Sequence, residues 1–404
     1  MRRLFSNSAF STPPWKTLVV CLISCAIGGG SAYGQQEIVD VVVPQNHIEV
    51  AAPCGMQQSI TVKKTVGTES ILIDAKDEIW VVSAHQAPQF GGRKAQRDSC
   101  ASGIEFETQS LVCSRWQPQS LSDLAFAHQS DPEHVTIMIV HGNNTDNEWA
   151  LTRGMQFYDR IFGKCLNGRP PVRLIILAWE SQKVLPRPCL DYKLKSAKAV
   201  ALGPNIGALL GELGGNRPVL VGYSLGAQVV LSTLTHIEGC GSSASCEFQA
   251  GFHVAFIAPA LEADFACEDL SAINNNPLIA DAQIFVNRND RAVLAAQLLN
   301  RQRCDNRSVE PSLVGLADKG RLDANRFQLH DVTREVRNRH SLVNYIESTT
   351  VQRCMLRVVA NAKAEHSNQT VEFCGQQVAK EVASTSTNLE GNSAATSPEP
   401  SIKR

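Results

Sequence analysis

VLVGYSLGAQVV, at residues 219–230, is the stretch of this sequence that decides its fold. Apolar strand-forming residues lead into Gly-Tyr-Ser-Leu-Gly at residues 222–226, and a helix-compatible segment continues to about His236. A serine between two glycines in such a turn is typical of a nucleophile elbow, where a sharp strand-to-helix reversal exposes the hydroxyl. The segment therefore predicts strand, turn and helix, with Ser224 as an exposed nucleophile. The alternative is a glycine-rich turn that carries an inert serine.

Apolar strands alternate with helical patterns on both sides of this segment. We expect further strands at residues 135–140, 172–179, 252–258, 283–286 and 327–332, and helices at about 146–162, 197–213 and 342–348. This alternation is the signature of a doubly wound, mostly parallel sheet. Shorter strands at 37–43, 71–73, 78–84 and 105–112 predict an antiparallel β region at the N-terminal side. The predicted fold class is α/β.

The first 34 residues have the pattern of an export signal. Basic residues precede an apolar run at residues 18–27, which is too short to span a bilayer, and small residues surround Gly34. Cleavage near Gly34 predicts a secreted or periplasmic protein. Alternatively, Leu-Ile-Ser-Cys at residues 22–25 forms a lipoprotein box, in which case Cys25 is lipidated and anchors the protein to a membrane.

Length and composition predict one large domain with appendages. The chain has 404 residues, of which 43% are hydrophobic, and a single domain of this size usually carries insertions or tails. Residues 380–404 are polar and lack periodicity, so we expect them to be disordered. The expected divisions are a signal peptide at 1–34, a β-rich extension at 35–77, an α/β domain at 78–352, a C-terminal extension at 353–379 and the tail.

Charge and cysteine content narrow the classes of partner. A net charge of −1, without basic runs, gives no attraction to nucleic acid. Two of the 13 cysteines lie in the export signal, and the other 11 contain no zinc-like CxxC pair, so disulfides are expected in an oxidising compartment. Plausible local bridges join Cys165 with Cys189, Cys267 with Cys304, and Cys354 with Cys374.

The sequence lacks HExxH and a strand-linked GxGxxG, so neither a metal nor another cofactor is expected.

Several short motifs resemble those of the α/β-hydrolase superfamily. They are His141-Gly142-Asn143 after the first parallel strand, the elbow itself, Ala178-Trp179-Glu180-Ser181, Asp191-Tyr192 and Asn289-Asp290-Arg291-Ala292. The resemblance covers roughly residues 78–352 and implies the α/β-hydrolase fold and hydrolase activity. More narrowly, the chain resembles bacterial α/β hydrolases of unassigned substrate, so the resemblance implies no substrate.

A serine nucleophile requires a histidine base and an acid that orients it. The hydroxyl is a poor nucleophile at neutral pH, and in this superfamily the acid and then the histidine follow the serine in the chain. His340 lies in a loop between the last expected strand and the closing helix, where the base belongs. His330 lies inside that strand and is the alternative base.

The acid is expected in a turn that follows a strand. Asp290 comes after the strand at 283–286 through a polar turn, whereas Asp281 precedes that strand. Asp264, after the preceding strand, is the alternative acid. The predicted catalytic triad is therefore Ser224, Asp290 and His340.

The oxyanion that forms during attack on a carbonyl needs two hydrogen-bond donors. One is expected from the backbone N–H of Leu225, which follows the nucleophile, and the other from the turn after the strand at 135–140. Asn143 occupies the second position, while His141 is expected to be structural.

These residues predict a serine hydrolase that cleaves carboxylic esters through an acyl-enzyme, with a small-molecule or acyl substrate. Amides and thioesters are cleaved by the same constellation. Residues 180–196, 261–280 and 293–325 leave the sheet near its carboxyl edge and are expected to form the substrate pocket. The alternative function is an inactive binding or scaffold protein of the cell envelope with the same fold.

Overall fold

The structure is a computed structural model that describes most of the expected α/β domain. The described residues are 58–64, 67–84, 106–112, 114–163, 169–186, 188–239, 251–260, 277–292 and 326–365. The expected export signal, the strand at 37–43 and the C-terminal tail lie outside them. Of the six cysteines in the three expected bridges, only Cys354 has a described side chain, and it is a free thiol.

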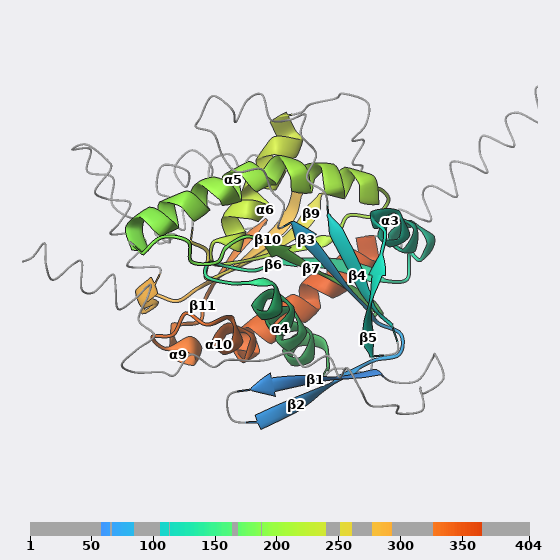
Figure 1. Cartoon of the computed structure of the whole chain (residues 1–404), viewed down its shortest axis with the longest axis horizontal. Helices are drawn as coiled ribbons and strands as arrows, with labels where there is room; N and C mark the ends of the chain where they lie inside the picture. The colour runs from blue at the N-terminus through green and yellow to red at the C-terminus, as the bar shows by residue number, and fades with distance from the viewer. Residues whose placement is uncertain are drawn as a thin grey trace, which may run out of the picture.

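In the described part of the chain, nine strands form one sheet in the order β11-β10-β9-β8-β6-β7-β3-β4-β5 (Figure 1). They are β3 (Glu78–Ala84), β4 (Glu107–Val112), β5 (Arg115–Gln119), β6 (Val135–Val140), β7 (Val172–Trp179), β8 (Val219–Tyr223), β9 (Phe252–Ile257), β10 (Ile279–Val286) and β11 (Phe327–Asp331). All neighbours from β11 to β3 are parallel. The predicted α/β class with a mostly parallel sheet is confirmed.

The antiparallel region differs in detail from the prediction. Strand β3 was expected to belong to the antiparallel region, but it pairs in parallel with β7 on one side and antiparallel with β4 on the other. Strands β4 and β5 extend the nine-stranded sheet as an antiparallel edge. Most of β3 is buried, as in strands covered on both faces, which suits a parallel sheet. The two N-terminal strands β1 (Gln58–Lys64) and β2 (Gly67–Ile73) form a separate hairpin.

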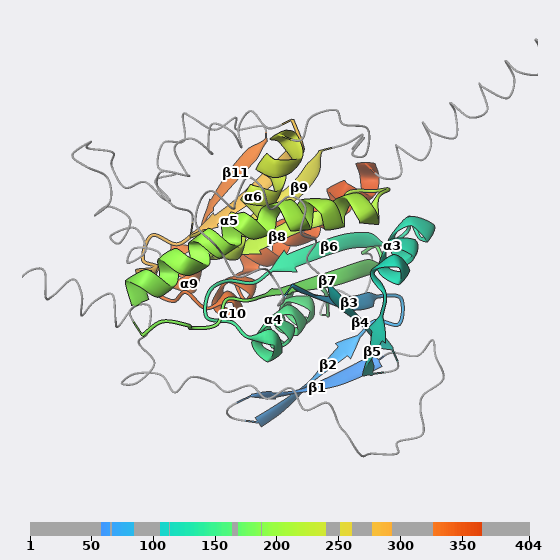
Figure 2. The same cartoon turned by 45° about the horizontal axis from the view of Figure 1, so that its top comes forward.

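Helices cover both faces of the sheet. Figure 1 shows α5 (Pro188–Leu213) and α6 (Gly226–Gly239) on one side, and α4 (Asn147–Tyr158), α9 (Thr333–Val336) and α10 (Leu342–Ile346) on the other. Helix α3 (Leu121–Ser130) lies beside the end of α5, as the turned view in Figure 2 shows. A π-helix (Asp159–Gly163) extends α4, and a further helix spans residues 349–365. None of the described helices is long and apolar enough to cross a membrane.

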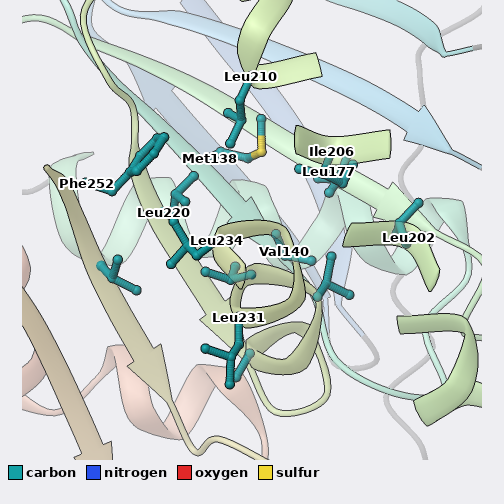
Figure 3. Packing of buried hydrophobic residues seen from close by; sticks show 14 of the residues in the cluster. Met138, Val140, Leu177, Leu202, Ile206, Leu210, Leu220, Leu231, Leu234 and Phe252 are labelled. Atoms are coloured by element: carbon teal, nitrogen blue, oxygen red, sulfur yellow. The ribbon is translucent and has the colours of Figure 1, made fainter. Parts of the chain in front are cut away.

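The core consists of two apolar layers that alternate along each central strand. In β6, Met138 and Val140 join the layer under α5 and α6, whereas Ile137 and Ile139 join the layer under α4. Figure 3 shows the first layer, in which Leu202 of α5 also lies. A fully buried aliphatic side chain contributes about 1.5–3 kcal/mol, so a register slip that reversed these faces is strongly disfavoured. The carboxyl ends of the parallel strands are thereby held at one edge.

Element boundaries differ from the predictions at several ends. Strand β10 begins at Ile279 rather than at residue 283, and α5 begins at Pro188 rather than at 197. A proline is well tolerated in the first turn of a helix, because its missing N–H has no partner to lose there. Strand β9 stops at Ile257, since Ala258 has a φ of 47° that is incompatible with continuing the strand.

Candidate active site

The segment that dominated the sequence folds as strand β8, a tight turn and helix α6, with Ser224 in the turn. Ser224 has a φ of 52°, a left-handed conformation that is uncommon for a residue with a side chain. Backbone hydrogen bonds hold it there: its N–H donates to Ile257 O (2.9 Å), and its carbonyl accepts from Ala260 N–H (3.1 Å). Strain of this kind persists only where the surroundings enforce it, and it is common at functional sites.

Two glycines let the elbow pack against the end of strand β6. A Cβ at Gly226 would lie 2.2 Å from Val140 O, and one at Gly142 would lie 2.8 Å from the Cβ of Ser224. Both distances are too short for any side chain. The turn after β6 therefore lies directly against Ser224.

Three side chains from distant parts of the chain meet at this turn. Ser224 Oγ lies 2.8 Å from His340 Nε2, and His340 Nδ1 lies 2.7 Å from Asp290 Oδ2. Asp290 follows strand β10, and His340 lies between α9 and α10. The prediction that Ser224 is exposed is wrong: it is 4% exposed, because the turn after β6 and the ring of His340 pack against it. Asp290 is 1% exposed, whereas the side chain of His340 is 26% exposed. The imidazole is thus the member of the set that is most open to solvent.

The buried carboxylate of Asp290 has further hydrogen-bond partners. Oδ2 also accepts from the hydroxyl of Tyr345 (2.8 Å), and Oδ1 accepts from the backbone N–H of Ala292 (3.0 Å). The turn that carries Asp290 is closed by its own N–H, which donates to Asn287 O (3.1 Å), and Asn287 Oδ1 accepts from Asn289 N–H (3.0 Å). These bonds compensate burial of the charge and fix its direction.

Two tyrosines hold the histidine and the acid in place. The hydroxyl of Tyr223 donates to the backbone carbonyl of His340, and the two rings lie 5.5 Å apart. Burial, and next the charge of Asp290, raise the pKa of Tyr223 and of Tyr345 above its usual value. Both phenols are therefore protonated donors at neutral pH.

The turn after β6, which lies against Ser224, carries the predicted oxyanion donor Asn143. Asn143 Oδ1 accepts from Asn144 N–H (2.9 Å), and Asn143 O accepts from the hydroxyl of Thr145 (3.3 Å). Among the described residues, no group accepts the N–H of Asn143 or of Leu225. Their role as oxyanion donors stays a prediction.

His141 belongs to the support of this turn. The backbone N–H of Trp179 donates to His141 Nε2 (3.0 Å), so Nδ1 carries the proton and donates to Gly142 O (2.9 Å). The ring also stacks on Trp179 at 5.7 Å. Ser181, two residues after the end of β7, contacts the same turn, because its hydroxyl lies within hydrogen-bond distance of Gly142 O (2.9 Å) and of Thr145 O (3.0 Å). The contacts of His141 thus hold the turn after β6 against the end of β7.

His330 and Asp281 lie elsewhere, and Asp281 is inside β10, near its amino end, rather than before the strand as predicted. His330 Nε2 is bonded to Gln283 Oε1 (2.8 Å), and its ring stacks on Phe285. Asp281 pairs with His253 at the opposite end of β10 (3.0 Å). Neither contacts Ser224. The alternative acid Asp264 lies outside the described residues, as do residues 293–325 of the expected pocket and most of 261–280.

Several residues that support Ser224, His340 and Asp290 were not predicted from the sequence. The bonds from Tyr345 to Asp290 and from Lys195 to Asn144 have no local pattern that marks them, because each joins two different parts of the chain. Ser181 and Tyr223 do lie inside quoted motifs, which was the one available signal. No group of three His, Cys, Asp or Glu side chains in the described part of the chain is placed to hold a metal ion.

Comparison with known proteins gives one match. Residues 120–345, more than half of the chain, match the sequence model of a family described as "Alpha/beta hydrolase of unknown function (DUF900)". No curated protein and no solved structure matches the chain.

Proposed function

This chain belongs to that alpha/beta hydrolase family, and from this premise we propose that it is a serine hydrolase that cleaves carboxylic esters through an acyl-enzyme. One observation carries the proposal. An unbroken chain of contacts runs from Ser224 Oγ through both nitrogens of His340 to the buried carboxylate of Asp290, and it begins at a strained elbow. Nucleophile, base and orienting acid are the parts that this reaction needs.

In the acylation step, Ser224 Oγ attacks the ester carbonyl while His340 Nε2 accepts the hydroxyl proton. The 2.8 Å contact between these atoms is within the range for proton transfer. His340 Nδ1–H donates to Asp290, so Nε2 is the free base, and the carboxylate stabilises the imidazolium that forms. The imidazolium then gives its proton to the leaving alcohol, and the acyl group stays on Ser224.

In the deacylation step, a water molecule replaces the alcohol. His340 takes a proton from the water, which attacks the acyl carbonyl, and returns it to Ser224 Oγ as the acid leaves. The side chain of His340 is 26% exposed, so its imidazole is partly open to water. In both steps the carbonyl oxygen becomes an anion. The N–H groups of Leu225 and Asn143, which have no acceptor among the described residues, are the proposed donors to it.

The substrate and location are proposed from the sequence. The chemistry suits a small-molecule or acyl ester, with amides and thioesters as alternatives. The pattern of residues 1–34 supports work outside the cytoplasm, as a secreted or periplasmic protein, with lipidation of Cys25 as the route to a membrane. Mass spectrometry of the exported protein tests this, because an uncleaved N-terminus contradicts both routes.

Labelling with a fluorophosphonate tests the enzymatic proposal. We expect the folded protein to form a covalent adduct at Ser224, and Ser224→Ala to remain unlabelled. A panel of esters of increasing acyl length, with matched amides and thioesters, then identifies the preferred bond. A folded protein that neither labels nor hydrolyses any of these supports the inactive scaffold instead.

A further inference from the structure

Lys195 is a buried ammonium group that reaches the turn beside the proposed site. It lies in the second turn of α5, and its side chain is 1% exposed. Its Nζ donates to Asn144 Oδ1 (2.8 Å) and lies 2.6 Å from Asp191 Oδ2. The ammonium of Lys195 thus contacts one carboxylate on its own helix and one amide oxygen on the turn after β6.

Asp191 connects this ammonium to the loop that leaves β7. Its Oδ1 accepts from the backbone N–H groups of Val184 and Leu185, both at 2.8 Å. Burial alone would raise the pKa of Asp191, but the Lys195 ammonium and these two N–H groups lower it below its usual value. Asp191 is therefore a charged acceptor that fixes the first part of this loop.

Asn144 is the point at which the pair acts on the turn. It has a φ of 56°, and its backbone N–H donates to Ser181 O (2.8 Å). Asn143, whose N–H is a proposed oxyanion donor, immediately precedes it. The peptide group between Asn143 and Asn144 is therefore held in place through Asn144. The side chain of Asn144 is in turn held by Lys195.

We propose that Lys195 and Asp191 are positioning residues that hold the turn at residues 142–145 so that the N–H of Asn143 faces the carbonyl oxygen of a substrate. The proposal rests on the ester-hydrolase function proposed above. It gives a role to the Asp191-Tyr192 motif, which the chemistry of Ser224, His340 and Asp290 leaves unexplained.

Stability is a poor explanation for this pair. Removing an ammonium and a carboxylate from water costs several kcal/mol per ion, and replacing a buried ion pair by apolar residues is often neutral or stabilising. A pair whose members both bond to loops beside the nucleophile is instead suited to fixing geometry, which catalysis requires to within about 0.5 Å.

Hydrogen–deuterium exchange of the full-length protein tests the positioning directly. Lys195→Met removes the ammonium and keeps a similar volume, and Asn144→Gly removes only the side chain, because glycine tolerates a φ of 56°. We expect both variants to exchange faster than wild type in peptides that cover residues 141–145. Lys198→Met is the matched control, since Lys198 lies one turn along the same helix and bonds to Glu180 instead (2.8 Å).

Unchanged exchange in Asn144→Gly overturns the proposal, whether or not Lys195→Met folds. Asn144→Asp keeps an oxygen for the ammonium and is expected to restore protection. This readout needs no substrate, so an inactive wild type would contradict the hydrolase function without deciding the role of Lys195.

Ester kinetics give the second measurement. We expect kcat to fall roughly 10-fold in Asn144→Gly and in Lys195→Met with little change in KM, because an oxyanion donor acts mainly in the transition state. The double variant should lose no more than Lys195→Met alone, since both changes break one interaction. Independent, additive losses, or a loss confined to unfolding temperature, overturn the proposal.

Discussion

Strand β10 has a histidine–carboxylate pair near each of its ends, and the two pairs differ in what lies at the second ring nitrogen. Beyond the carboxyl end, His340 bonds to Asp290 through Nδ1 and to the hydroxyl of Ser224 through Nε2. Near the amino end, His253 of β9 bonds to Asp281 through Nδ1 (3.0 Å), and its Nε2 lies 3.1 Å from Glu365 Oε2. One histidine faces a nucleophile, and the other faces a second carboxylate.

This difference gives the two histidines different roles: His340 can accept a proton, whereas His253 links neighbouring elements through two ion pairs. Burial alone would lower the pKa of His253, but Asp281 and Glu365 raise it above the usual value, so the imidazolium is favoured. In its protonated form His253 has no free electron pair with which to accept a proton. It instead joins β9, β10 and the helix at 349–365. The carboxyl ends of the strands, where parallel sheets bind ligands, hold the pair that retains a free nitrogen.

The largest expected effect is loss of turnover when the carboxyl-end set is broken. Ser224→Ala and His340→Ala should each lower kcat on the order of 10⁶-fold, because neither residue works without the other. His253→Gln should retain turnover. Ester hydrolysis by folded variants is the measurement. Near-normal activity in His340→Ala would show that His340, at the carboxyl end of β10, is not the base.

A matched change of the two carboxylates sharpens the same contrast. Asp290→Asn should lower kcat by roughly 10⁴-fold, because the amide donates to the histidine, favours the wrong tautomer and carries no compensating charge. Asp281→Asn at the other end of β10 should leave kcat near that of wild type and lower stability instead. Equal effects of the two changes on kcat would remove the distinction between the ends.

The order of the elements and the meeting of three side chains could be predicted from the sequence, because each had a local pattern. Parallel strands buried on both faces read as apolar runs, and the elbow places its serine at a strand end. Asp290 and His340 follow strands whose carboxyl ends lie at the same edge. Chain order was therefore enough to bring them to Ser224.

The sequence analysis did not predict β5, helix α3 or the bonds of Tyr345 and Lys195, for different reasons. Strand β5 reads RWQPQ and is mostly exposed, so it has no apolar run that predicts a strand. Helix α3 was missed although Ser120 and Asp123 form a capping box, which was a usable signal. The bonds from Tyr345 and Lys195 join elements far apart in the chain, and only the packed structure specifies them.

Substitutions of Asn143, in the turn after β6, should have the next largest effect on kcat. If the backbone N–H of Asn143 is the donor, Asn143→Ala should keep much of the activity, whereas Asn143→Pro removes the N–H and should lower kcat about 10²-fold. The unfolding temperature of both variants serves as the control for folding. An equal, severe loss in both would assign the role to the side chain.

His128 of α3 is a second buried histidine, bonded to Thr136 near the amino end of β6, and it should affect stability with the opposite pH dependence from His253. Burial lowers the pKa of His128 to about 4, and its Nε2–H donates to Asn216 O (2.6 Å). Because the folded pKa lies below the unfolded value of about 6.5, the contribution is full above pH 6.5 and is lost as pH falls toward 4. The shift corresponds to ~3 kcal/mol. Urea unfolding should show this acid loss in wild type and a smaller one in His128→Asn; equal slopes would contradict it.

The smallest expected effect is the alkaline loss of stability at His253. Its folded pKa is raised, so the imidazolium stabilises the fold fully below the unfolded pKa of about 6.5, and this contribution disappears as pH rises through the folded pKa. Glu365 is 44% exposed and solvent screens it, so we expect about 1 kcal/mol or less, or about 2–4 °C in unfolding temperature. The measurement is the difference in unfolding free energy between wild type and His253→Gln from pH 5.5 to 8.5, with His128→Asn as the control that should keep the alkaline loss. A difference that stays constant or grows with pH would mean that His253 is neutral in the folded protein, and the amino-end pair would then be a hydrogen-bonded contact rather than an ionic clamp.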